Sequence, residues 1–181
     1  MIEEIGDGYF VRLLRESDID GPYVTWFEDQ ETTRFNRHGK TFMRRRDLVD
    51  FLEQANSASR IDWAVCDSRG QHIGNVSLSE LSLVNRSAEF GILVGDRAHR
   101  GKGVGRRAAH ALLRHGFIKV DLERIACGTA ATNTGMIGLA RSLGMQEEGR
   151  RRSALHLEGG RVDIIEFGVL RDEFLRTDAG R

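Results

Sequence analysis

Three glycines within six residues, between a strand-like run and a helix-like run, constrain this chain more than any other feature. They lie in Arg100-Gly-Lys-Gly-Val-Gly105. The run before them, Ala88-Glu-Phe-Gly-Ile-Leu-Val94, is typical of a strand, and apolar residues with helical spacing follow from Val104 to Ile118. Backbone N–H groups converge on an anion where a strand passes into a helix through such a loop. The pattern therefore predicts an anion site at this junction.

The charge at the start of the predicted helix supports an anion site. The positive N-terminus of a helix favours acidic side chains, yet this segment carries Arg100, Lys102, Arg106 and Arg107. A bound polyanion would neutralise both the side chains and the helix end. We expect that polyanion to be a pyrophosphate.

Three loop patterns compete for these glycines. A P-loop needs Gly-x-x-x-x-Gly-Lys-Ser/Thr, and a dinucleotide fold needs Gly-x-Gly-x-x-Gly with an acidic residue at the end of the next strand. Neither fits, because no Lys-Ser or Lys-Thr follows and the next strand ends in Cys127-Gly-Thr129. The third pattern is Gln/Arg-x-x-Gly-x-Gly/Ala, and Arg100, Gly103 and Gly105 match it. A tight glycine turn on a solvated basic surface is the simpler alternative for so short a motif.

That third pattern is the acyl-CoA pyrophosphate loop of the GNAT N-acetyltransferases, and a second segment resembles the same family. In residues 133–145, Asn133 is a good helix N-cap and Gly144 a good terminator. The family has a signature in which an asparagine opens a helix that ends in Leu-Gly-Phe/Met. The segments 85–91 and 163–170 resemble its RimJ/RimL-like branch.

The predicted elements alternate irregularly along the chain. Strands are expected at residues 9–15, 61–67, 72–81, 88–94, 124–129, 146–157 and 162–170, and helices from Ser17 or Asp18 to Phe27 and at 47–55, 104–120 and 133–143. This order predicts an α+β fold rather than a regular βαβ alternation. The resemblance implies the GNAT fold: a mixed, mostly antiparallel sheet of about seven strands flanked by about four helices. We expect one domain over 1–181, with a core at 9–174 and a frayed end at 176–181.

Composition narrows the class of protein. Lysine plus arginine equal aspartate plus glutamate at 27 each, which argues against a general nucleic-acid or membrane binder. The start has no signal-peptide pattern, and no apolar run approaches the ~20 residues that span a bilayer. The cysteines, Cys66 and Cys127, lie in strand-like runs without metal-ligand neighbours at useful spacing. We expect a cytoplasmic protein without a metal, as a monomer or homodimer.

The resemblance implies an enzyme, an acetyl-CoA-dependent N-acetyltransferase. A primary amine would attack the thioester directly in a ternary complex. The strand before the loop would hold the pantetheine arm through its backbone, and the family's cofactor-contacting asparagine matches Asn133. The residues expected to bind the cofactor are Ile92, Leu93, Val94, Arg100, Gly101, Lys102, Gly103, Val104, Gly105, Arg106 and Asn133.

Glu89 is the candidate catalytic base. Side chains alternate along a strand, so the core face would carry Ala88, Phe90, Ile92 and Val94. Glu89 then shares the opposite face with Gly91, near the expected position of the acyl group. It could accept the amine proton, directly or through water. An ordinary exposed glutamate is the alternative.

The usual general acid is absent. Many family members carry a tyrosine at the position of Ala140, and this chain has only Tyr9 and Tyr23. Ser142, Cys127 or water could replace it, and the sequence favours none of them. We therefore expect no essential acid in the 133–143 helix.

Substrate signals are indirect. Trp26, Asn36-Arg-His38, Lys40 and Arg150-Arg-Arg152 lie where family members build the acceptor cleft. Basic residues there would suit an acidic acceptor, although such runs more often form a solvated surface. The acceptor stays open between a protein N-terminus, a small amine and a nucleotide-linked amino sugar. A different class of function, an acyl-CoA-binding module with little or no turnover, is suggested by Ala140.

Overall fold

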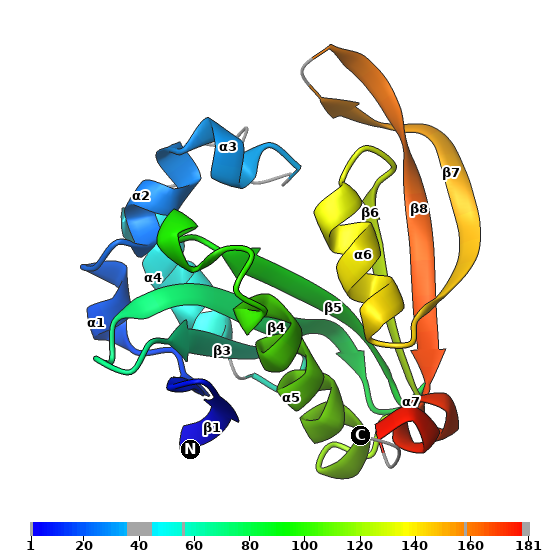
Figure 1. The fold of residues 1–181 in the computed structure, drawn as a ribbon, viewed down its shortest axis with the longest axis horizontal. Helices are drawn as coiled ribbons and strands as arrows, with labels where there is room; N and C mark the ends of the chain where they lie inside the picture. Colours follow the sequence, from blue (N-terminus) through cyan, green and yellow to red (C-terminus); the bar gives the residue numbers. More distant parts are fainter. Residues whose placement is uncertain (1, 36–44, 56, 158, 179–181) are drawn as a thin grey trace.

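Eight strands form a single mixed sheet in the computed structural model, which describes residues 2–35, 45–55, 57–157 and 159–178. The strand order is β1-β2-β3-β4-β5-β6-β8-β7 (Figure 1). The strands are β1 (Ile2–Gly6), β2 (Tyr9–Leu13), β3 (Ile61–Cys66), β4 (His72–Ser82), β5 (Ser87–Val94), β6 (Arg124–Ala130), β7 (Gln146–Leu157) and β8 (Gly160–Leu170). Neighbouring strands are antiparallel except β5 and β6, which are parallel.

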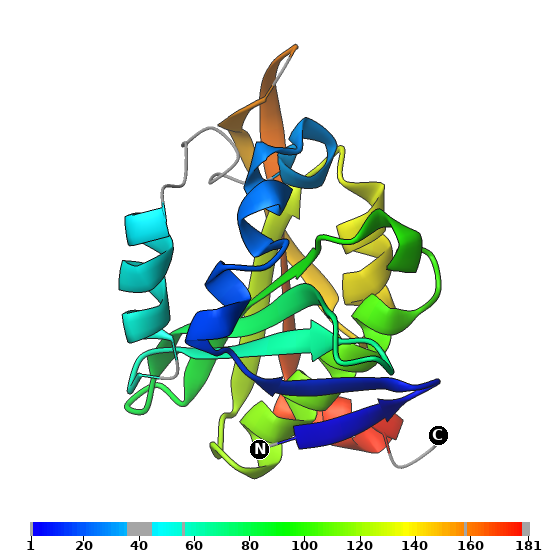
Figure 2. The ribbon, with the colours of Figure 1, turned by 90° about the vertical axis from the view of Figure 1, so that its left-hand side faces the viewer.

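Helices cover both faces of this sheet. They are α1 (Glu16–Ile19), α2 (Tyr23–Glu28), α3 (Gln30–Thr33), α4 (Arg45–Gln54), the 3-10 helix η2 (Arg97–His99), α5 (Val104–Ile118), α6 (Thr134–Ser142) and α7 (Arg171–Asp178). Figure 2 shows α4, in cyan, on one side of the sheet and α6, in yellow, on the other. No helix in the described part of the chain is long and apolar enough to cross a membrane.

The two faces of β5 pack against different layers, as its alternating sequence predicts. Phe90 is buried in the main core with residues of α5, including Ala108 and Leu112. Leu93 points the other way and packs against Tyr23 and Trp26 of α2. Burial of each such large side chain contributes about 1.5–3 kcal/mol. This packing fixes β5 between the two helical layers.

The predicted α+β fold and mixed sheet are confirmed, with one strand more than expected. The additional strand is β1, whose five residues pair antiparallel with β2. The expected first helix is divided into α1 and α2, because Pro22 cannot continue a helix and instead begins the second one. The short α3 and the C-terminal α7 were not foreseen.

The expectation of a frayed end is wrong for residues 176–178. They belong to α7, which is anchored by the buried Phe174. Asp178 also forms ion pairs with His110 at 2.9 Å and Arg114 at 3.5 Å. These long-range contacts hold the last turn of the helix.

The β5–β6 pair is short, and this positions the site. Only three residue pairs join the two strands, Ser87–Glu89 with Arg124–Ala126. Beyond Glu89 the ladder stops, while β5 continues to Val94 and β6 to Ala130. Two parallel strands therefore part in the middle of the sheet.

Candidate active site

The glycines of the loop meet separate local requirements. Gly101 and Gly103 have φ of 73° and 77°, a left-handed backbone that favours glycine. Gly105, in the first turn of α5, lies close to β5, since a Cβ there would lie 3.3 Å from Ile92 Cδ1. Gly103 is the N-cap of α5, and no side chain caps the helix. The loop thus ends in a helix start whose first N–H groups remain available to a ligand.

A cleft of about 500 Å³ opens at this helix start, within the size range of cofactor sites. It brings together most of the residues predicted to bind the cofactor: Ile92, Leu93, Val94, Arg100, Gly101, Gly103, Val104, Gly105, Arg106 and Asn133. Its remaining lining comes from Thr32, Phe35, His99, Gly135, Met136 and Leu139. The cleft therefore joins the glycine loop to the end of β5 that pairs with β4 but not with β6.

Two predicted site residues lie outside this lining. Lys102 is exposed, and its carbonyl accepts a hydrogen bond from Arg107 Nη1 at 3.2 Å. Glu89 is exposed at the last paired position between β5 and β6. Within the described residues its carboxylate makes no hydrogen bond or ion pair.

Asn133 holds the start of α6 from the cleft side. Its Oδ1 accepts a hydrogen bond from Met136 N at 3.2 Å, and its Nδ2 donates to Thr129 Oγ1 at 3.1 Å. Met136 and Leu139, three residues apart, present one face of the helix to the cleft. The predicted N-cap is confirmed.

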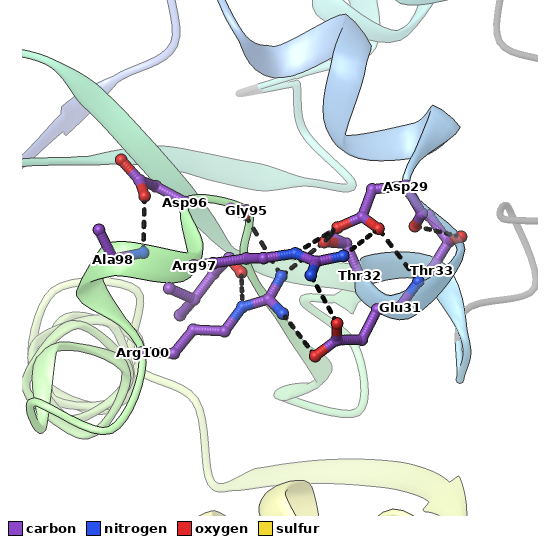
Figure 3. Close-up of polar contacts among 10 residues, drawn as sticks. Asp29, Glu31, Thr32, Thr33, Gly95, Asp96, Arg97, Ala98 and Arg100 are labelled. Atoms are coloured by element: carbon purple, nitrogen blue, oxygen red, sulfur yellow. Dashed lines mark hydrogen bonds and ion pairs between the residues drawn. The ribbon is translucent and has the colours of Figure 1, made fainter.

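The guanidinium of Arg100 is turned away from the glycine loop. Nε donates to Val94 O at 2.9 Å, and Nη2 donates to Thr32 Oγ1 at 2.5 Å and to Gly95 O at 3.3 Å (Figure 3). Arg100 therefore connects the end of β5 to α3. Sequence reasoning missed α3 as a wall of the cleft, because its four residues lie 61 to 64 positions before β5 ends and carry no motif.

Two carboxylates lie on the sheet face opposite α5. Glu166 of β8 pairs with Gly128 of β6, and a Cβ on Gly128 would lie 2.8 Å from Glu166 Oε2. Glu89 lies on the other side of β6, opposite Ala126. By strand geometry, Gly128 lies about 8 Å from Glu89 between Cα atoms. The sequence pattern gave no signal for Glu166, which depends on strand pairing.

The basic residues expected at the acceptor cleft are largely neutralised or elsewhere. Arg150 pairs with Asp163 at 3.2 Å, and Arg151 pairs with Glu166 at 2.5 Å. Trp26 is buried against Gly95 rather than exposed in a cleft. Residues 36–38 and Lys40 lie outside the described residues.

The two candidate acids, Ser142 and Cys127, do not line the cleft. Nor does Ala140, which holds the position of the family's tyrosine. Ala140 is fully buried in the main core. Cys127 is also buried there, and burial, with smaller effects of Glu166 and Glu89, raises the pKa of its thiol to about 12. Ser142 Oγ donates to Leu139 O at 2.8 Å. In the described part of the chain, no group of three or more His, Cys, Asp or Glu residues could hold a metal ion.

Comparison with known proteins agrees with this geometry. Two solved acetyltransferases share the fold. The spermidine N-acetyltransferase of Vibrio cholerae, in complex with CoA and spermine, has a TM-score of 0.84 and 21% identity over 94% of this chain and 99% of that one. RimL, a ribosomal-protein α-N-acetyltransferase in complex with CoA, has a TM-score of 0.84 and 15% identity over 96% and 99%.

Sequence comparison identifies the family. Residues 10–146 match the model of the GNAT acetyltransferase domain. YdaF of Bacillus subtilis, named as a proposed ribosomal N-acetyltransferase, is 30% identical over 105 residues, which cover 58% of this chain and 57% of YdaF. The chain belongs to the GNAT acetyltransferase family, and it is an N-acetyltransferase, an acyltransferase whose acceptors are amines.

Proposed function

We propose that this protein binds acetyl-CoA in the cleft and transfers its acetyl group to a primary amine by direct attack. The observation that carries the proposal is the continuity of the cleft from the uncapped start of α5 to the end of β5, where β5 has no partner on its β6 side. The N–H groups of residues 101–105 would hold the pyrophosphate, with Lys102 and Arg106 beside it. The backbone of Ile92, Leu93 and Val94 would pair with the pantetheine arm. Arg100 and Asn133 would contribute mainly by shaping this cleft.

In this proposal, positioning of the two reactants accounts for most of the lowering of the reaction barrier. Holding the amine against the thioester removes on the order of 7–11 kcal/mol of barrier. The amine nitrogen forms a bond to the acyl carbon, and the carbon–sulfur bond breaks. Glu89 would accept the proton from the amine, directly or through water, while the departing thiolate takes a proton from solvent.

The acceptor that we propose is an amine with a further positive charge. Arg150 and Arg151 are already ion-paired, so within the described residues these two arginines offer little free charge to an acidic acceptor. The face near the strand opening instead carries two carboxylates and one counter-charge: Glu89 makes no ion pair within the described residues, and Glu166 pairs with Arg151. Spermidine acetyltransferases are among the proteins that share this fold. We accordingly place the chain near the RimJ/RimL-like branch and rank polyamines and protein N-termini above nucleotide-linked amino sugars.

Free thiol release from acetyl-CoA tests this proposal directly. The panel would contain 1,4-diaminobutane, spermidine, a peptide with a free N-terminus and a nucleotide-linked amino sugar. We expect thiol release with a polyamine or the peptide at least ~10-fold above that with the amino sugar. Tight CoA binding without thiol release from any acceptor would instead support a binding module without turnover.

A further inference from the structure

One wall of the cofactor cleft comes from a segment distant in sequence from the glycine loop. This wall is α3, whose Thr32 lines the cleft together with Phe35 just beyond the helix. The helix has four residues, and a single turn of helix is not stable on its own in water. Its position must therefore be fixed by contacts with other elements.

Asp29 is the residue through which α3 is held. Its carboxylate accepts hydrogen bonds from Glu31 N at 3.2 Å and from the Thr32 hydroxyl, and its carbonyl accepts from Thr33 Oγ1 at 2.9 Å. The same carboxylate accepts two hydrogen bonds from Arg97 of η2, at 3.0 Å from Nε and 2.5 Å from Nη2 (Figure 3). Such a two-pronged pair fixes orientation as well as distance. The hydrogen bonds from Arg97, more than any other cause, hold the pKa of Asp29 well below its usual range.

Two arginines contact residues within α3 itself: Arg97 contacts Glu31, and Arg100 contacts Thr32. Arg97 Nη1 lies 2.7 Å from Glu31 Oε2. Arg100 Nη2 donates to Thr32 Oγ1 at 2.5 Å while Nε donates to Val94 O at 2.9 Å. Arg100 thus joins α3 to Val94, the last residue of β5, which lines the same cleft, while Arg97 joins α3 to η2.

From these contacts, and resting on the proposed function, we propose that Arg97 and Arg100 are positioning residues for acetyl transfer. They fix α3 against the end of β5, so that Thr32 and Phe35 complete the cleft around the cofactor. Arg100 acts through its contacts with α3 rather than as a ligand of the pyrophosphate. Both arginines lie in the segment between β5 and the glycine loop, and α3 forms one wall of the cofactor cleft. Because the cofactor would contact both parts, packing of α3 against this segment and binding of the cofactor stabilise each other.

Arg97→Gln tests the proposal, because Arg97 does not line the cleft itself. The matched control is Arg171→Gln, which removes another exposed arginine–aspartate pair, with Asp121, far from the cleft. Calorimetry with CoA gives the affinity, and a thermal melt gives the stability. We expect about three- to tenfold weaker CoA binding for Arg97→Gln and unchanged binding for the control, with melting temperatures alike.

Two further measurements separate positioning from general stability. Arg97→Lys keeps the charge but loses the planar fork, so it should restore only part of the affinity. The difference in CoA affinity between wild type and Arg97→Gln should shrink at about 1 M salt, which screens exposed ion pairs. Arg97→Lys also serves as the test if the glutamine variant fails to fold, since it should still bind CoA more weakly than wild type.

The results distinguish this inference from the proposed function. If wild-type protein does not bind CoA, both the proposed function and this inference are refuted. Wild-type binding together with unchanged affinity in Arg97→Gln would overturn the inference alone. Equal weakening in the Arg171→Gln control would overturn it too, because the effect would then not depend on α3.

Discussion

Replacing Gly103 with glutamate should weaken CoA binding by more than about 100-fold in a protein that still folds. The backbone at Gly103 has φ of 77°, which costs a residue other than glycine roughly 1–2 kcal/mol. A Cβ there would lie 2.9 Å from Arg107 Nη1, the far end of a flexible side chain that can move aside. At about 2–4 °C for each kcal/mol, we expect the melting temperature to fall by roughly 2–8 °C.

The expected loss of CoA-binding free energy is larger than the free-energy cost of this backbone strain. The new carboxylate would compete with the pyrophosphate at the uncapped start of α5. One pair of like charges about 5 Å apart repels by about 3 kcal/mol at an effective dielectric constant of about 20. That corresponds to more than about 100-fold in the dissociation constant.

Calorimetry with CoA measures this loss. Gly103→Ala is the first control, because it carries the same backbone strain without the charge and should weaken binding less than about tenfold. Gly138→Ala is the second, since nothing lies within 4 Å of its added Cβ and it should bind CoA as wild type does. A folded Gly103→Glu protein with normal CoA affinity would refute the assignment of the pyrophosphate to this loop.

Four further expectations address catalysis, specificity and pH. Glu89→Gln should lower turnover by about 10²–10⁴ without changing CoA affinity, and near-normal turnover at neutral pH would leave Glu89 a structural residue. Ser142→Ala should retain turnover in the thiol-release assay, whereas a loss of about a hundredfold would show that α6 supplies the acid. Glu166→Gln, which also removes the ion pair of Arg151, should raise KM for 1,4-diaminobutane but not for butylamine, because only the diamine carries a second positive charge; an equal rise for both amines would count against binding of that charge near Glu166. Burial is the largest single effect on Asp18 and opposes its ionisation, but hydrogen bonds from Arg12 and from Arg15 N, with the nearby positive charge, together outweigh it and lower its pKa. The stability that Asp18 contributes is therefore complete above its unfolded pKa of about 4 and is lost as pH falls through the folded value. Thermal melts of wild type and Asp18→Asn against pH should converge at low pH; a constant difference would contradict this.

The elements whose signals are local could be predicted from the sequence. Alternation along β5 and helical spacing in α5 are properties of short windows, and the glycine requirements at Gly101 and Gly103 are set by their own backbone angles. The N-cap role of Asn133 is local too. Most lining residues of the cleft follow from these signals together.

What the sequence could not show depends on pairing between distant segments. Arg97 and Asp29 are 68 residues apart, and nothing in either neighbourhood indicates the contact. Arg151 is part of a basic run in the sequence, but its partner Glu166 becomes apparent only from the register of β7 and β8. Strand β1 was missed because its five residues, IEEIG, contain too few apolar positions to show alternation.

The parting of β5 and β6 has a thermodynamic consequence for the whole domain. With only three residue pairs between them, the two halves of the sheet are joined at one end. A ligand that pairs with the free backbone of β5 acts as a missing strand, and it stabilises only the folded state. At a concentration 100 times its dissociation constant, such a ligand adds about 2.7 kcal/mol to the free energy of unfolding. The stability of this protein should therefore rise and fall with the supply of its cofactor, and the sheet should be most open to local unfolding when the cofactor is scarce.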